Sequence, residues 1–168
     1  MRKRNQGMTL VELMITLIIA AVLIAIAVPS LHTLTMSSRS RSATDGLYQD
    51  LMMARQLAAT YQNSVTVCHL SSNSCDGDWS KGYTVFIDAD GSNSFTLGDE
   101  TVQTRRPLND ADKLIYAANQ VRFNGDGSSI NNGDFVYCPN DANSEYSRSI
   151  RLSSSGMLRS LGVSGNCS

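Results

Sequence analysis

The sequence predicts an α+β fold in which a long, kinked N-terminal helix packs on an antiparallel, β-rich globular head. Two observations support this class. Residues 8–28 are almost wholly apolar, and from residue 64 onward short β-type runs alternate with Gly, Asn, Asp and Ser. A chain of 168 residues without an apparent repeat or second domain fits one head behind one helix, in a lollipop arrangement.

The apolar segment 8–28 follows a basic start that contains Arg2, Lys3 and Arg4. As a helix it would be about 30 Å long, which matches the hydrocarbon core of a bilayer. The segment therefore predicts a single membrane-spanning helix with its basic end in the cytoplasm.

Glu12 is the only charged residue within this apolar segment. A carboxylate inside a membrane helix costs about 2.5–3.5 kcal/mol, so such a residue is a functional-site hypothesis by default. The plainer alternative is that Glu12 lies close enough to the helix end to reach the membrane interface.

Gly7 after the basic segment, the run Met-Thr-Leu-Val-Glu and Pro29 beyond the apolar stretch together resemble the type IV prepilin signature. The resemblance implies that a prepilin peptidase cleaves between Gly7 and Met8 and methylates the new amine of Met8. It also implies that Glu12 pairs with the N-terminus of a neighbouring subunit during assembly. Opposite charges would neutralise each other in such a low-dielectric helix core, where an unpaired charge is costly.

The first mature residue departs from the family pattern, and a secretory signal peptide is the main alternative to a prepilin leader. The prepilin family usually begins its mature chain with Phe, whereas this chain has Met8. A secretory signal peptide shares the basic start but has a shorter apolar run that ends in an A-x-A-like site, and Ile26-Ala-Val-Pro29 is a poor match to one. The sequence therefore favours a prepilin leader.

Helical periodicity continues beyond Pro29, so this proline predicts a kink in the helix. The expected segments are a leader 1–7, a transmembrane and assembly helix 8–29, an amphipathic half 30–62 and a β-rich head 63–168. The apolar stripe expected to face the sheet is Leu31, Leu34, Leu47, Leu51, Ala54, Ala58 and Tyr61. The polar residues expected mostly on other faces are Ser37, Ser40, Arg41, Thr44, Asp45, Gln49 and Asp50.

Strands are expected in eight short runs of the head. They are residues 64–70, 83–88, 100–106, 113–117, 121–124, 135–138, 149–153 and 157–161.

The charge of the mature chain excludes a generally nucleic-acid-coating protein. The sequence has 14 basic and 15 acidic residues, and loss of the three basic residues in the leader leaves 11 basic residues and a net charge of −4. A local basic patch remains compatible with this balance.

Four cysteines follow the membrane helix: Cys68, Cys75, Cys138 and Cys167. An even number beyond the membrane fits disulfides in an oxidising compartment, and three pairings are possible. The favoured pairs are Cys68–Cys75, which closes a short Ser/Asn-rich loop, and Cys138–Cys167, which ties down the C-terminus. A zinc site at Cys68, His69 and Cys75 is less favoured, because no C-x-x-C spacing occurs.

The head resembles the GspH/FimT (FimU) type of minor pilins and pseudopilins. The residues that carry this resemblance are Trp79-Ser-Lys-Gly82-Tyr83-Thr-Val-Phe86-Ile-Asp88, then Asp90-Gly91, Gly98-Asp99-Glu100 and, more loosely, Ile150-Arg-Leu-Ser-Ser-Ser-Gly156-Met-Leu-Arg159. Asp88, Asp90, Ser92 and Asp99 offer oxygens for calcium, but they do not fit the EF-hand frame. We expect a solvated hairpin there, and no metal or cofactor.

Catalysis finds no support, because no nucleophile constellation accompanies His32 and His69. DNA binding is a further alternative, since some members of this type take part in DNA uptake through a C-terminal Gly-Arg-x-Arg motif. Here Gly156 and Arg159 match that motif but Met157 replaces its first arginine. Arg148, Arg151 and Arg159 could form a small phosphate-binding cluster.

The resemblance implies a noncatalytic minor pilin that primes assembly of a type IV pilus or lies at its tip. Its expected partners are major and minor pilins, the prepilin peptidase and the inner-membrane assembly machinery. It would be a single-pass protein of the bacterial inner membrane before assembly, and periplasmic or extracellular afterwards. A type II secretion pseudopilin and a DNA-binding minor pilin of natural transformation are the alternatives.

Overall fold

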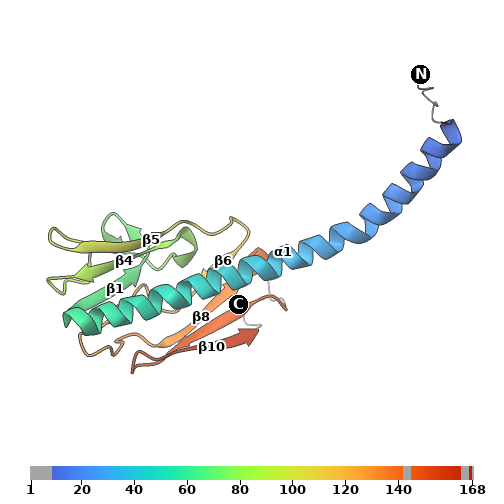
Figure 1. The fold of residues 1–168 in the computed structure, drawn as a ribbon. Helices are drawn as coiled ribbons and strands as arrows, with labels where there is room; N and C mark the ends of the chain where they lie inside the picture. Colours follow the sequence, from blue (N-terminus) through green and yellow to red (C-terminus); the bar gives the residue numbers. More distant parts are fainter. Residues whose placement is uncertain (1–8, 142–144, 164–166, 168) are drawn as a thin grey trace, which may run out of the picture. The chain divides into compact units, whose positions relative to one another are not determined.

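The structure is a computed structural model that describes residues 9–141, 145–163 and 167. The chain divides into two compact units, Met1–Ser37 and Ser38–Ser168. The helix α1 (Leu10–Tyr61) contributes residues to both units (Figure 1).

The first unit carries an exposed apolar helix surface. Every large aliphatic side chain of α1 from Leu10 to Val28 is at least half exposed. Within the described residues, α1 is the one helix long and apolar enough to cross a membrane. Apolar surface of this extent is unfavourable in water, so it requires lipid or other apolar helices around it.

The second unit contains the end of α1 and a set of short strands and 3-10 helices. In chain order they are β1 (Ser64–Cys68), β2 (Leu70–Ser71), β3 (Ser74–Cys75), η1 (Trp79–Lys81), β4 (Tyr83–Asp88), β5 (Glu100–Arg105), β6 (Lys113–Ile115), β7 (Val121–Phe123), β8 (Gly133–Cys138), η2 (Pro139–Asp141), β9 (Arg148–Leu152) and β10 (Leu158–Val163).

These strands form two four-stranded sheets and a small ribbon, all antiparallel. One sheet has the order β5-β4-β1-β7, the other has the order β10-β9-β8-β6, and β2 pairs with β3. The α+β class is therefore confirmed, and each of the eight predicted strands has a counterpart. The ribbon β2-β3 was not predicted, because two-residue strands in a Ser/Asn-rich loop have no β pattern to detect.

The core of the head lies where the end of α1 meets both sheets (Figure 1). Leu47, Leu51, Ala54 and Ala58 are buried there, as the helical stripe predicted. The prediction was wrong for Leu31 and Leu34, which precede the head unit and are exposed. It was also wrong for Tyr61, which is exposed at the last residue of α1.

The buried face of α1 is more polar than predicted, because Ser40, Thr44 and Asp50 are buried. Their hydrogen bonds explain this. Ser40 donates to the carbonyl of Tyr146 at 2.5 Å, and Thr44 donates to the carbonyl of Ser40 at 2.7 Å. A buried polar group with a partner is tolerated where an unpaired one is not.

Two buried carboxylates tie α1 to the two sheets. Asp50 on α1 accepts hydrogen bonds from the Tyr83 hydroxyl of β4 and from Arg105 of β5. In the link to the second sheet the helix supplies the arginine instead of the acid. Asp112 accepts from the Tyr137 hydroxyl of β8 at 2.6 Å and lies 3.4 Å from the guanidinium of Arg39 on α1. Each sheet thus has its own charged link to the helix.

Candidate functional site

The N-terminal end of α1 places Glu12 in its first turn. The backbone N–H of Thr9 donates to Oε2 of Glu12 at 3.3 Å, and the backbone N–H of Glu12 donates to Oγ1 of Thr9, also at 3.3 Å. This reciprocal pair is a capping box, which satisfies two N–H groups at the helix N-terminus and places the acid at the positive end of the helix dipole. Glu12 itself is exposed.

The predicted cleavage site, Gly7–Met8, lies outside the described residues. Thr9 directly follows Met8 in the chain. The Glu12 carboxylate therefore accepts a hydrogen bond from the residue next to the predicted mature N-terminus. Pro29 lies within α1, which is assigned as one continuous helix through that position. A kink at Pro29 stays a prediction.

All four cysteines are in disulfide bonds, with the connectivity that the sequence favoured. Cys68 bonds Cys75 with a Cα–Cα distance of 5.6 Å, and Cys138 bonds Cys167 with a Cα–Cα distance of 5.8 Å. Neither Cys68 nor Cys75 is therefore a thiolate that could bind zinc.

The ring of His69 contacts an acid rather than a metal ligand set. Its Nδ1 lies 2.8 Å from a carboxylate oxygen of Asp76. A hydrogen bond from the Asp78 backbone, followed by that contact with His69, lowers the pKa of Asp76.

The acidic turn after β4 brings together the carboxylates of Asp88, Asp90 and Asp99, whose nearest oxygens lie within 4.8 Å of one another. Each carboxylate accepts a backbone N–H of the turn: Asp88 and Asp90 accept that of Ser92, and Asp99 accepts that of Ala89. Hydrogen bonds from Ser92 lower the pKa of Asp90. These contacts stabilise the hairpin, as expected for Asp in turns.

The three arginines singled out for DNA do not form one cluster. Arg159 of β10 is directly opposite Arg151 of β9, and Arg151 is in turn opposite Asp134 of β8, so these three share a face of the sheet. Arg148 lies three residues before Arg151, and alternate strand residues point to opposite faces. Its Nε is buried and has no hydrogen-bond partner among the described residues.

Asp134 neutralises one of the two aligned arginines. Its carboxylate oxygens lie 2.7 Å from Nε and 2.7 Å from Nη2 of Arg151. This contact lowers the pKa of Asp134. Arg159 is exposed, and its side chain forms no ion pair with the described residues.

Gly156, which begins the motif-like stretch before Arg159, has a structural reason to be glycine. Its φ is +73°, and a Cβ atom there would lie 2.0 Å from the carbonyl oxygen of Gly127. Arg55 on α1 donates to the same carbonyl at 3.0 Å. The glycine lets the β9–β10 turn approach the loop backbone at Gly127, which Arg55 of α1 also contacts. Met157 beside it is exposed.

Sequence reasoning missed the Asp50 and Asp112 networks and a cavity beside β5. Nothing in the local spacing indicates that Asp50 meets Tyr83 and Arg105, because those residues lie 33 and 55 positions away in the chain. The one local signal was Asp50 itself, an acidic residue directly before Leu51 of the predicted apolar stripe.

An exposed apolar helix with an acid in its first turn, continuous with a head of two antiparallel sheets, defines the class of pilin-like assembly subunits. Two family models match the chain. The prokaryotic N-terminal methylation motif matches residues 2–28, and the type II transport protein GspH matches residues 43–156, which is more than half of the chain. The chain therefore belongs to the GspH family of pilins and pseudopilins, whose role is structural.

Two solved structures share its fold. The type IV minor pilin FimU of Pseudomonas aeruginosa is 21% identical, covers 71% of this chain and 86% of its own, and gives a TM-score of 0.56. The minor pseudopilin EpsH of the Vibrio cholerae type 2 secretion system is 14% identical, covers 74% and 97%, and also gives 0.56. Comparison with curated protein sequences finds no significant match.

Proposed function

We propose that this chain is a noncatalytic minor pilin of a type IV pilus. A prepilin peptidase cleaves between Gly7 and Met8 and methylates Met8, and the inner-membrane assembly machinery then moves α1 from the membrane into the helical core of the filament. There the chain primes assembly or lies at the tip, beside major and other minor pilins. It is a single-pass inner-membrane protein first and a periplasmic or extracellular subunit afterwards.

The observation that supports this most strongly is the position of Glu12. It lies in the first turn of an otherwise apolar, exposed helix, close to the predicted new N-terminus. An ammonium from a neighbouring chain would meet the carboxylate in a medium of low dielectric, where their attraction is strong. Such a contact would fix the depth of each helix against the next.

The test replaces Glu12→Ala and follows the chain in cells. We expect insertion and processing to be unchanged and incorporation into sheared filaments to be lost. The matched control is Thr16→Ala, which removes another polar group of the same helix, one that donates only to the carbonyl of Leu13. Mass spectrometry of the wild-type chain should give Met8 as the methylated N-terminus. Normal incorporation of Glu12→Ala, or a different N-terminus, contradicts the proposal.

A pseudopilin of a type II secretion system is the second candidate, favoured by the fold shared with EpsH. Secretion and pilus assays on one deletion strain separate the two. The pilus proposal predicts lost piliation with intact secretion, and the pseudopilin alternative predicts the reverse.

DNA binding is supported only by the aligned pair Arg151 and Arg159 on one face. Because Asp134 neutralises Arg151, we expect the chain to bind DNA weakly, with a salt dependence that reflects about one phosphate contact. Asp134→Asn should raise DNA affinity and steepen the salt dependence in gel shifts, whereas Asp126→Asn, at another exposed turn, should not. Equal shifts for both variants contradict a role for this face in DNA binding.

A further inference from the structure

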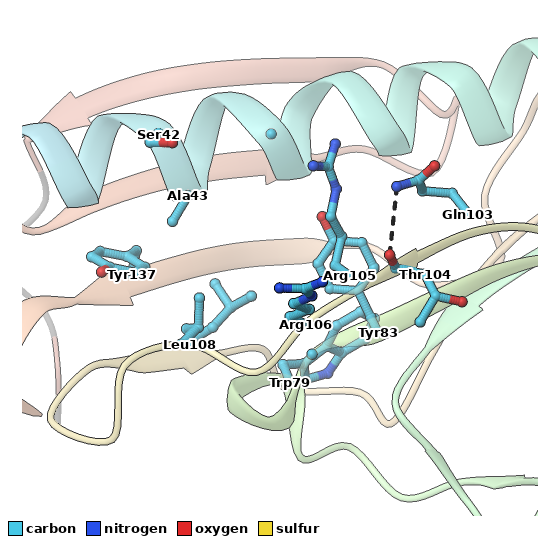
Figure 2. A pocket seen from close by; sticks show the side chains of 13 residues that line it. Ser42, Ala43, Trp79, Tyr83, Gln103, Thr104, Arg105, Arg106, Leu108 and Tyr137 are labelled. Atoms are coloured by element: carbon cyan, nitrogen blue, oxygen red, sulfur yellow. Dashed lines mark hydrogen bonds between the residues drawn. The ribbon is translucent and has the colours of Figure 1, made fainter.

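A cavity of about 410 Å³ opens in the head between α1 and the end of β5 (Figure 2). Its floor is apolar and aromatic, with Trp79, Tyr83 and Leu108, and Ala43 and Gly46 of α1 form the facing wall. This volume and lining are typical of a pocket that accepts a side chain or a small ligand.

Gly46 has no side chain, so α1 does not narrow the cavity at this wall. A glycine within a helix costs about 1 kcal/mol relative to alanine. A Cβ atom at position 46 would meet only the guanidinium of Arg105, at 3.9 Å, so no backbone packing requires the glycine. Its structural effect is to leave room beside Arg105.

The rim of the cavity carries one unbalanced positive charge. The guanidinium of Arg105 is neutralised by Asp50, at 2.6 Å. The neighbouring Arg106 also lines the cavity, is exposed, and forms no ion pair with any described residue. A ligand with a carboxylate next to an apolar group would therefore match both rim and floor.

The cavity also adjoins an open sheet edge. β5 is the first strand in the order β5-β4-β1-β7, and its only partner among the described strands is β4. Gln103, Thr104 and Arg105 of this strand line the cavity. An exposed edge presents unpaired backbone groups to which an extended peptide can add as a further strand.

We propose that this cavity binds an extended, acidic peptide segment of a neighbouring filament subunit. The segment lies along β5, places an apolar side chain over Trp79 and Leu108, and sets a carboxylate on Arg106. That the segment comes from a filament neighbour rests on the function proposed above. The peptide chemistry rests on the cavity alone.

The test selects a random hexapeptide library, displayed on phage, on the immobilised full chain in detergent micelles. We expect enrichment of sequences with Asp or Glu next to a large apolar residue. The selected peptide, made synthetically, should change the fluorescence of Trp79 saturably, because Trp79 is the only tryptophan and lines the cavity. Backbone N-methylation of the peptide should weaken its binding.

Arg106→Gln, at an exposed position, should weaken that binding at least tenfold. The matched control Arg159→Gln, an exposed arginine on another sheet, should leave it unchanged. The proposal is overturned by enrichment of basic or purely apolar peptides, by no enrichment over bare micelles, by equal binding to Arg106→Gln, or by N-acetylglutamate binding as tightly as the peptide.

Incorporation of the wild-type chain into filaments is scored separately. A chain that enters filaments but binds no peptide contradicts the cavity proposal alone. A chain that binds the peptide but never enters filaments contradicts only the proposed function.

Discussion

Asp50 of α1 and Arg105 of β5 form a two-point ion pair, with Nε to Oδ2 at 2.6 Å and Nη2 to Oδ1 at 2.9 Å. The side chain of Asp50 is only 6% exposed, whereas that of Arg105 is 43% exposed. Tyr83 donates to the same carboxylate at 2.8 Å. One acid on the helix thus holds two adjacent strands.

Replacement Asp50→Asn should destabilise the head. Arg105 can turn toward water, but the Tyr83 hydroxyl stays buried with a poorer acceptor, so we expect a loss of about 1–3 kcal/mol in the free energy of unfolding. Urea unfolding of the full chain in detergent, followed by Trp79 fluorescence, measures it. The control is Asp134→Asn, which breaks an exposed pair and should cost about 1 kcal/mol or less. Equal losses of unfolding free energy in the two variants would show that the buried pair contributes no more to stability than the exposed pair.

Alkaline pH should weaken the head through its buried phenols. Burial first, and then the nearby carboxylates Asp50 and Asp112, raise the pKa of Tyr83 and Tyr137 well above the ordinary value. Because the folded state holds these protons more tightly, their stabilising effect is complete below about pH 10, the ordinary tyrosine pKa, and is lost as the pH rises further.

The urea midpoint should therefore fall above about pH 10. Tyr83→Phe and Tyr137→Phe should each make that fall shallower, because a phenylalanine has no proton to lose. Tyr61→Phe is the control, since Tyr61 is exposed at the end of α1. A fall of the same steepness in all four proteins contradicts the assignment.

Gly156→Ala should cost more than Gly162→Ala. Both glycines have almost the same positive φ, +73° and +74°, so the backbone strain is matched. A Cβ at position 156 would meet the Gly127 carbonyl, whereas a Cβ at position 162 meets nothing within 4 Å. The extra loss in unfolding free energy should be about 1–3 kcal/mol, typical of overpacking. A difference below the error of the urea curves would mean that the turn shifts freely.

The two disulfides should differ in their contribution to stability. Cys138–Cys167 spans 29 positions and Cys68–Cys75 spans 7. On the chain-entropy model these loops correspond to about 3.6 and about 2.4 kcal/mol. Paired Cys→Ser variants, compared by urea unfolding, should show the larger loss for Cys138 and Cys167. Thiol titration of the wild-type chain should find no free cysteine; two reactive thiols would contradict one of the two bonds, and four would contradict both.

Much of this fold could be predicted from local patterns. The long helix follows from the unbroken apolar run 8–28 and from the helical periodicity beyond Pro29, and the strands follow from short β-type runs between turn residues. The errors lie where tertiary contacts decide. Asp50 is buried because distant strands supply its partners, and Tyr61 is exposed because the helix ends at that residue.

The candidate sites divide in the same way. Glu12 was recognisable because a charge in an apolar helix is a local anomaly. Arg148 is separated from Arg151 and Arg159 because alternate residues of a strand point to opposite faces and because the strand register pairs Arg151 with Arg159. Asp134, which neutralises Arg151, comes from a third strand. The cavity beside Arg106 involves a helix, an edge strand and loops far apart in the chain, so no sequence motif could have indicated it.

Within one molecule the Glu12 carboxylate already accepts the backbone N–H of Thr9, so on the proposed function it has a hydrogen-bond donor before a neighbouring subunit reaches it. An arriving amine would compete with a donor already in place, so docking becomes an exchange of partners. Such an exchange releases less free energy than neutralising a bare charge, and it is correspondingly easier to undo. On the proposed function, the contact between Glu12 and a neighbouring chain would therefore form reversibly.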